Sequence, residues 1–182
     1  MKQAVVLLAD GFEEVEALTV VDLLRRARVY VDTISITEDY TVRGAHGIPV
    51  LTEDLFTEVN FDEMDMVVLP GGMPGTTNLL EHAGVREVVT KFVQENKPVA
   101  AICAAPMILS ELGLVKGKMI TCYPSIEPNI KGAVITRTPV AADGNIITSR
   151  GVGCAIDFAL KLIEILVGKE MAAKIAEDIV YE

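Results

Sequence analysis

Apolar runs and amphipathic stretches alternate from the start of the chain. An unbroken apolar run at Ala4–Ala9 is followed by a stretch with helical spacing, and a second run extends from Tyr30 to Ile36. The stretch between them has apolar residues three and four positions apart, at Ala17, Val20, Val21, Leu24 and Ala27. The runs predict strands buried on both faces, as in a parallel sheet, and the spacing predicts one face of a helix. Strand, helix and strand in this order predict a layered α/β fold.

The alternation resumes after a small excursion. The segment Val42–Leu51 has two glycines between short apolar stretches and predicts a small hairpin. Further strands are expected at Met66–Leu69, Val99–Ile102 and Ile146–Ser149, with strand-like residues at Met119–Thr121. Every expected strand is short and apolar, which is typical of a buried central sheet.

Helices are expected between and after these strands. One lies near Val85–Gln94, and another runs from the residues after Cys103 to Leu112. The apolar positions from Ala155 to Leu166 follow a helical period, and Lys169–Ile179 predicts one more short helix. A tight turn is expected at the dipeptide Asp143-Gly144.

Composition indicates a soluble protein of one domain. The 182 residues fit a single domain, 1–182, of ordinary size. Hydrophobic residues make up 51% of the chain, yet no apolar run approaches the roughly 18 residues of a membrane span. The first apolar run leads into Asp10, Glu13 and Glu14, unlike the longer apolar region of a secretory signal. We therefore expect a cytoplasmic protein with no membrane partner.

Charge and cysteine content narrow the function further. The net charge of −10 repels phosphate backbones and anionic lipids, so we expect no nucleic-acid partner. The cysteines, Cys103, Cys122 and Cys154, are odd in number and form no CxxC pair. They suggest neither a disulfide framework nor a structural zinc site. We expect no metal, and any special cysteine should be a reactive one.

Residues that directly follow strands are the first candidates for function, because ligands of open α/β sheets bind beyond the carboxyl ends of the strands. Three loops stand out: ADGFEEVE after the first strand, LPGGMPG after the strand ending at Leu69, and ICAAP around Cys103. We expect all three to meet at one edge of the sheet.

Cys103 lies between a buried strand and a predicted helix. Unpaired N–H groups and the positive end of a helix dipole favour a thiolate there, which lowers the pKa and raises reactivity. The small Ala104 and Ala105 leave room for a reagent, and Pro106 fits the first turn of the helix. The alternative is a buried, inert cysteine, which is the commoner fate of a free cysteine taken alone.

Glu16 lies one turn into the first helix, so its carboxyl can point back toward the same edge. An ionised Glu16 would repel a thiolate, whereas a desolvated and protonated Glu16 would donate a hydrogen bond to the sulfur. Such a pair would titrate as a unit. Alternatively, Glu16 is one of three acids that favour a helix N-terminus, which is how we interpret Glu13 and Glu14.

Glycines and aromatic residues near the same edge have two interpretations each. Gly71 and Gly72 can bring bare backbone N–H groups to an oxyanion, or they form an ordinary turn. Tyr123 can face the edge as a hydrogen-bond donor or lie on the surface. His46 and His82 both precede Cys103 in polar surroundings, and we interpret them as surface residues.

Four segments, GFEEVE, VVLPGG, AAICAAP and TSRGVG, occur in an order and spacing that resembles the DJ-1/PfpI (ThiJ) superfamily, specifically its DJ-1-like branch. The resemblance covers essentially the whole chain. It implies a flavodoxin-like three-layer α/β/α sandwich with a mostly parallel central sheet, and a homodimer. It also implies that Cys103 is an oxidation-sensitive cysteine at a nucleophile elbow and that Glu16 is the acid bonded to it. Oxyanion-hole amides match Gly72 and Ala104, with Gly71 lining the same loop.

Members of this family are described as glyoxalases that turn methylglyoxal into lactate without a cofactor, as protein deglycases, and as oxidative-stress sensors or chaperones. The resemblance therefore implies a cysteine-dependent lyase or hydrolase of the glyoxalase III or deglycase type that acts on small reactive aldehydes in stress defence. The alternative is a non-enzymatic oxidative-stress sensor or redox-regulated chaperone, in which peroxide oxidises Cys103.

The chain departs from the family pattern at one point. Several family enzymes have a histidine directly after the cysteine or on the strand-end loop, where this chain has Ala104 and Tyr123. That departure leaves the efficiency of acid/base catalysis open, and Ala104 argues against the protease-like branch. No histidine follows His82, which argues against a glutamine amidotransferase, whose cysteine needs a later histidine.

Overall fold

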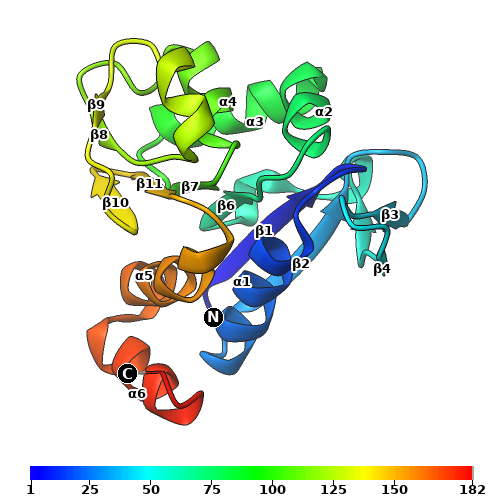
Figure 1. Cartoon of the computed structure of the whole chain (residues 1–182). Coiled ribbons are helices and arrows are strands. Elements are labelled where there is room, and N and C mark those ends of the chain that lie inside the picture. Colours follow the sequence, from blue (N-terminus) through cyan, green and yellow to red (C-terminus); the bar gives the residue numbers. More distant parts are fainter. Residues whose placement is uncertain (182) are drawn as a thin grey trace.

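The computed structural model describes residues 1–181 and has a seven-stranded central sheet between two layers of helices (Figure 1). Its strand order is β10-β11-β7-β6-β1-β2-β5, and all neighbours are parallel except the β10–β11 pair. The mostly parallel sheet is therefore confirmed. The strands are β1 (Gln3–Leu8), β2 (Tyr30–Ser35), β5 (Asp54–Leu55), β6 (Met66–Leu69), β7 (Val99–Ile102), β10 (Val140–Asp143) and β11 (Ile146–Ser149).

Helices cover both faces of this sheet, as the flavodoxin-like sandwich requires. The helices α1 (Glu14–Arg26) and α5 (Ala155–Val167) pack together on one face, and α6 (Lys169–Asp178) packs on α5. On the other face lie α2 (Gly75–Glu81), α3 (Ala83–Gln94) and α4 (Pro106–Glu111), which Figure 1 shows above the sheet. Within residues 1–181, no helix combines the length and the apolar character needed to cross a bilayer.

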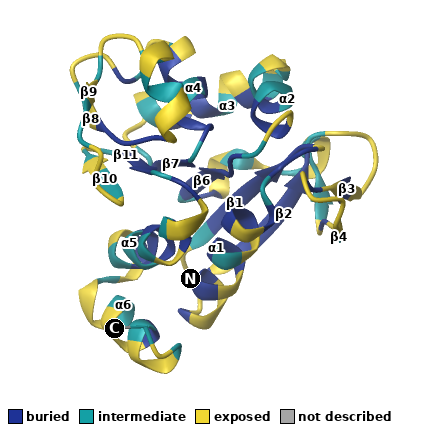
Figure 2. Cartoon of the chain, viewed as in Figure 1, coloured by how far each residue is buried: buried dark blue, intermediate teal, exposed yellow. Residues whose placement is uncertain are grey.

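The unbroken apolar run of β1 is explained by burial on both faces. Ala4, Val6 and Leu8 belong to the hydrophobic cluster beneath α1 and α5, while Val5 and Leu7 belong to the cluster beneath α3 and α4. All five side chains are fully buried, and β1 is dark blue in Figure 2. Each large aliphatic side chain buried in this way contributes about 1.5–3 kcal/mol to the stability of the fold.

Two small elements lie outside the central sheet. The expected hairpin is confirmed as β3 (Thr41–Arg43) paired antiparallel with β4 (Pro49–Leu51). The strand-like residues after α4 form β8 (Met119–Ile120), which pairs with β9 (Val134–Ile135) in a separate ribbon. The sequence did not predict α2, because Gly75–Glu81 spans too few turns for an apolar period to be visible.

Candidate functional site

Cys103 occupies a sharp bend directly after β7. Its φ of +64° is in the left-handed region, which non-glycine residues adopt at a cost of about 1–3 kcal/mol. The Cys103 N–H donates to Ser149 O at 2.9 Å, and its carbonyl accepts from Tyr123 N at 2.8 Å. These bonds to two other loops hold the bend, so the strained conformation is fixed by tertiary structure.

The Cys103 side chain is half-buried at the floor of a pocket of about 520 Å³. The expected meeting of three loops is confirmed, and residues after β8 and β11 complete the wall. A larger groove of about 660 Å³ between α5, α6 and β10 contains neither cysteine nor histidine. The lining of the Cys103 pocket is Glu13, Glu16, Gly72, Cys103, Tyr123, Pro124, Arg150, Gly151, Val152, Gly153 and Cys154.

Glu16 reaches the pocket from the first turn of α1 and is fully buried. Its Oε2 accepts a hydrogen bond from Gly71 N at 2.9 Å, and its carboxyl is hydrogen-bonded to the Cys103 thiol. Burial raises the pKa of Glu16 to about 7, and the charge of Glu13 acts in the same direction. Near neutral pH, the carboxyl is therefore partly protonated, and its ionised form accepts the hydrogen bond from the Cys103 thiol.

The two glycines of the loop after β6 act in different ways. A methyl group at Gly71 would come within 2.6 Å of both Cys103 Cβ and Glu16 Oε2, so this position leaves no space for a side chain. Its N–H is bonded to Glu16 and does not face a substrate oxygen. Gly72 has a φ of +89°, and its N–H, together with that of Ala104, donates to the Cys103 sulfur.

The structure contradicts the expectation that the surroundings of Cys103 lower its pKa. Burial, the charge of Glu16 and the hydrogen bond from the thiol to Glu16 raise the pKa to about 12. The N–H groups of Ala104 and Gly72 act in the opposite direction but are outweighed.

Cys103 and Glu16 are best described as a pair that shares its protons. The pair loses its first proton near the Glu16 pKa of about 7 and retains the second until about 12. Between these values the pair holds one proton, and the favoured form is the Cys103 thiol beside the Glu16 carboxylate. One of the two forms of this singly protonated pair is a thiolate beside a neutral acid, which is the reactive form.

The remaining wall of the pocket contains Tyr123, which the sequence analysis named, together with Arg150 and Cys154, which it missed. Tyr123 is 48% exposed, and its ring lies next to Gly151, where a methyl group would come 3.5 Å from the ring and 3.9 Å from the Cys103 sulfur. Arg150 is the cation of the pocket lining, 3.7 Å from Glu127. Cys154 belongs to the same wall. The signal was the segment TSRGVG, because its last four residues directly follow β11 at the carboxyl edge.

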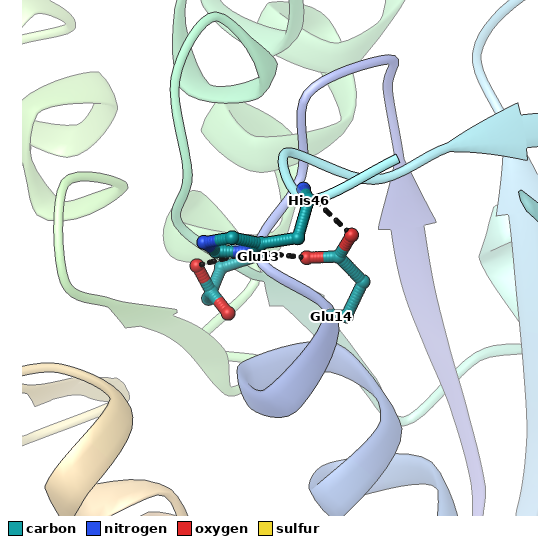
Figure 3. A group of neighbouring side chains, drawn as sticks. All are labelled: Glu13, Glu14 and His46. Carbon is teal, nitrogen blue, oxygen red and sulfur yellow. Dashed lines mark hydrogen bonds and ion pairs between the residues drawn. The ribbon is translucent and has the colours of Figure 1, made fainter. Parts of the chain in front are cut away.

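Glu13 and Glu14 are more than acids at a helix N-terminus, and His46 joins them (Figure 3). Glu14 is buried, and its Oε1 accepts from the backbone N–H of His46 at 2.8 Å, while its Oε2 lies 2.9 Å from His46 Nδ1. Glu14 thereby anchors the β3–β4 hairpin to α1. These three side chains offer ligand atoms within 4.8 Å of one another, but Glu14 already has hairpin donors on both oxygens.

His82 differs from the surface residue that we expected. Its Nδ1 accepts from Val85 N at 3.1 Å and caps α3, and its ring packs edge-on against Phe56 at 4.7 Å. Burial lowers its pKa. His82 is a structural residue and does not line the Cys103 pocket.

Comparison with known proteins gives consistent matches. A family model described as the DJ-1/PfpI family matches residues 2–165. Protein dj-1beta of Drosophila melanogaster is 37% identical over 98% of this chain and 96% of its own length. A Pyrococcus abyssi protein named a deglycase is 33% identical over 90% of this chain and 99% of its own length. The crystal structure of a DJ-1 superfamily protein from Salmonella typhimurium matches all of both chains with a TM-score of 0.96 at 35% identity.

Proposed function

The chain belongs to the DJ-1/PfpI family, and we propose that it converts methylglyoxal and related 2-oxoaldehydes to 2-hydroxy acids at Cys103, without a cofactor, in defence against reactive carbonyl compounds. The observation that supports this most directly is the contact of Cys103 with the buried carboxyl of Glu16 in an open pocket. A relative named a deglycase also supports it.

The first step is addition of the Cys103 thiolate to the aldehyde carbon, which forms a hemithioacetal. The N–H groups of Gly72 and Ala104, which donate to the sulfur, lie near the oxygen that becomes negative in this step. Glu16 gives this oxygen the shared proton. The pair therefore supplies both the nucleophile and the acid.

The second step moves a hydrogen within the bound substrate. A proton leaves the former aldehyde carbon and a proton is added to the neighbouring ketone carbon, so the first carbon is oxidised to a thioester and the second is reduced to an alcohol. Water then cleaves the thioester, which releases lactate and restores the thiol. The sum of the steps is addition of water to methylglyoxal, so electrons balance within the substrate.

The experiment is an assay of lactate formed by the purified protein from methylglyoxal. We expect Cys103→Ser to abolish turnover and Cys122→Ser to retain it, because Cys122 is fully buried and does not line the pocket. Turnover by the wild-type protein no higher than that of Cys103→Ser would reject the proposal.

A second candidate is a non-enzymatic oxidative-stress sensor, which requires no histidine beside Cys103. It is favoured by the N–H groups of Gly72 and Ala104, which would bond the oxygens of an oxidised sulfur. Mass spectrometry after mild peroxide treatment should then show two added oxygens at Cys103 before any at Cys122 or Cys154. Equal oxidation of all three cysteines would contradict this candidate.

We also propose a cytoplasmic homodimer, in keeping with the family resemblance. Exposed apolar side chains lie on α1 and on the β3–β4 hairpin, which Glu14 joins to each other: Val15, Leu18, Ile48 and Leu51. Light scattering of the purified protein tests the dimer, and a monomeric mass at micromolar concentration would contradict it.

A further inference from the structure

Glu13 belongs to two groups of side chains at once. It lines the Cys103 pocket, and its Oε2 lies 3.6 Å from Nδ1 of His46 (Figure 3). Its side chain is only 13% exposed, and its backbone N–H donates to Gly71 O at 2.9 Å. The Glu13 carboxylate therefore lies in a defined place between the pocket and the histidine.

His46 reaches this place from the β3–β4 hairpin, although it is far from Cys103 in the sequence. Its Nδ1 lies 2.9 Å from Glu14 Oε2, and its ring is 67% exposed, so it exchanges protons freely with solvent. The anchoring of the hairpin by Glu14 places a histidine behind a carboxylate of the pocket wall.

We propose that Glu13 is the second acid/base residue of the Cys103 pocket and that His46 is its positioning residue. The inference rests on the proposed 2-oxoaldehyde activity and deepens it. The Glu13–His46 pair provides the acid/base function that a histidine near the cysteine provides in several family enzymes. This chain has Ala104 and Tyr123 at the corresponding positions.

The hydrogen transfer in the hemithioacetal needs a base as well as the acid Glu16. Glu16 is buried and accepts a hydrogen bond from Gly71 N, and its proton has gone to the substrate oxygen in the addition step, so its carboxylate stays beside the sulfur. Glu13 lines the pocket, and its Oε2 lies 3.6 Å from Nδ1 of His46. Two carboxyl groups in such different surroundings divide the acid and base functions between them. Glu13 takes the proton from the former aldehyde carbon and returns it to the neighbouring carbon.

His46 attracts Glu13 by charge only while it is protonated. A neutral imidazole with its N–H on Nδ1 would donate that N–H to Glu14 Oε2, which lies 2.9 Å away. Glu13 Oε2, 3.6 Å from the same nitrogen, would then have no charged partner in His46. The hydrogen bond to Glu14 and the charges of Glu13 and Glu14 raise the pKa of His46 above 6.5. Activity should therefore decline on the alkaline side as His46 loses its proton.

The acid side of the pH profile has a different origin. It follows the loss of the first proton from the Cys103–Glu16 pair, so activity rises with pH through about 7. The titratable and charged groups around the Glu13–His46 pair are Asp10 and Glu14 next to the hairpin, Arg43 within it, Cys103 and Glu16 at the pocket floor, and Tyr123, Arg150 and Cys154 on the far wall.

The test compares pH profiles of kcat and kcat/KM for methylglyoxal in Glu13→Gln, His46→Gln and His46→Arg. We expect Glu13→Gln to lower kcat about 100-fold, in the range of a lost acid/base group, with little change in KM. His46→Gln should lower kcat about tenfold, because Glu13 loses its partner. His46→Arg keeps a permanent cation, so it should retain kcat and lose the alkaline decline.

Matched controls are Glu87→Gln, an exposed glutamate on α3, and His82→Gln, the other histidine. Alkylation of Cys103 by iodoacetamide checks that the pocket is intact in each variant. Wild-type kcat in Glu13→Gln, or an unchanged alkaline decline in His46→Arg, would overturn the inference while the proposed activity stands. A wild-type protein that forms no lactate refutes the activity itself.

Discussion

Glu16 and Asp32 are both buried carboxyl groups, yet they lie in different chemical settings. Burial is the main cause that raises the pKa of Glu16 to about 7 and that of Asp32 to about 6. Each also has one buried oxygen with no hydrogen-bond partner in the described part of the chain. Glu16 adjoins a cysteine and a pocket, whereas Asp32, on β2 near the sheet edge, is hydrogen-bonded to Asp54.

The difference teaches that a raised pKa alone does not identify a functional site. Both acids favour the protonated form for the same reason, which is the loss of water around the carboxylate. Of the two acids, Glu16 is the one that can exchange a proton with a cysteine that lines an open pocket. Asp32 adjoins Asp54 and does not line the Cys103 pocket, so its raised pKa bears on stability and not on chemistry.

The largest expected effect comes from removing the shared proton. Glu16→Gln keeps the shape of the side chain but cannot exchange a proton with Cys103, so kcat/KM for methylglyoxal should fall about 100-fold or more. The same substitution at the comparison site, Asp32→Asn, should leave kcat/KM unchanged within about twofold. Steady-state kinetics of both variants measure this contrast. Equal losses in the two variants would erase the distinction between the two acids.

The second effect concerns the space between Glu16 and Cys103. Gly71→Ala places a methyl group within 2.6 Å of both side chains, so the pair must separate. We expect a loss of about 1–3 kcal/mol in the free energy of unfolding, as for overpacked sites, and at least a tenfold loss of kcat. Gly153→Ala is the control, since a methyl group there meets nothing within 4 Å. Denaturant unfolding and kinetics together check the result, and a fully active Gly71→Ala would show that the close fit has no role.

The sequence predicted the strands and the position of Glu16 better than it predicted the surroundings of the buried side chains. Unbroken apolar runs specified β1, β7 and β11, and the position of Glu16 one turn into α1 placed it near Cys103, because these features depend on local spacing. The burial of Asp32 depends on segments that are distant from it in the sequence, and the contact of Glu13 with His46 joins two such segments. No local sequence pattern reveals either feature. The pKa of Cys103 was predicted in the wrong direction, since its burial depends on the surrounding loops.

The third effect is a pH dependence of stability at the comparison site. Since the folded pKa of Asp32 is about 6 and its ordinary value is 3.8, the folded state holds this proton more tightly than the unfolded state. The stability that it contributes is complete below about pH 4 and is lost as pH rises through about 6. Asp32→Asn removes this loss and should stabilise the protein at pH 7 by about 1–2 kcal/mol, or a few degrees in Tm. Thermal unfolding at pH 5 and pH 7 measures it. A variant less stable than wild type at pH 7 would mean that the fold stabilises the ionised Asp32 carboxylate and does not raise its pKa.

The smallest effect is expected at Tyr123, which lines the pocket but lies outside the Cys103–Glu16 pair. Its backbone N–H holds the Cys103 bend through the 2.8 Å bond to Cys103 O, and its half-exposed ring covers Gly151. Tyr123→Phe keeps the backbone bond and the ring and removes only the hydroxyl. If proton transfer depends on Glu16 and Glu13 and not on Tyr123, kcat should change less than about threefold. A 100-fold loss in Tyr123→Phe would instead identify the hydroxyl as an acid/base group, and would show that the reactive proton is not confined to the two carboxyl groups.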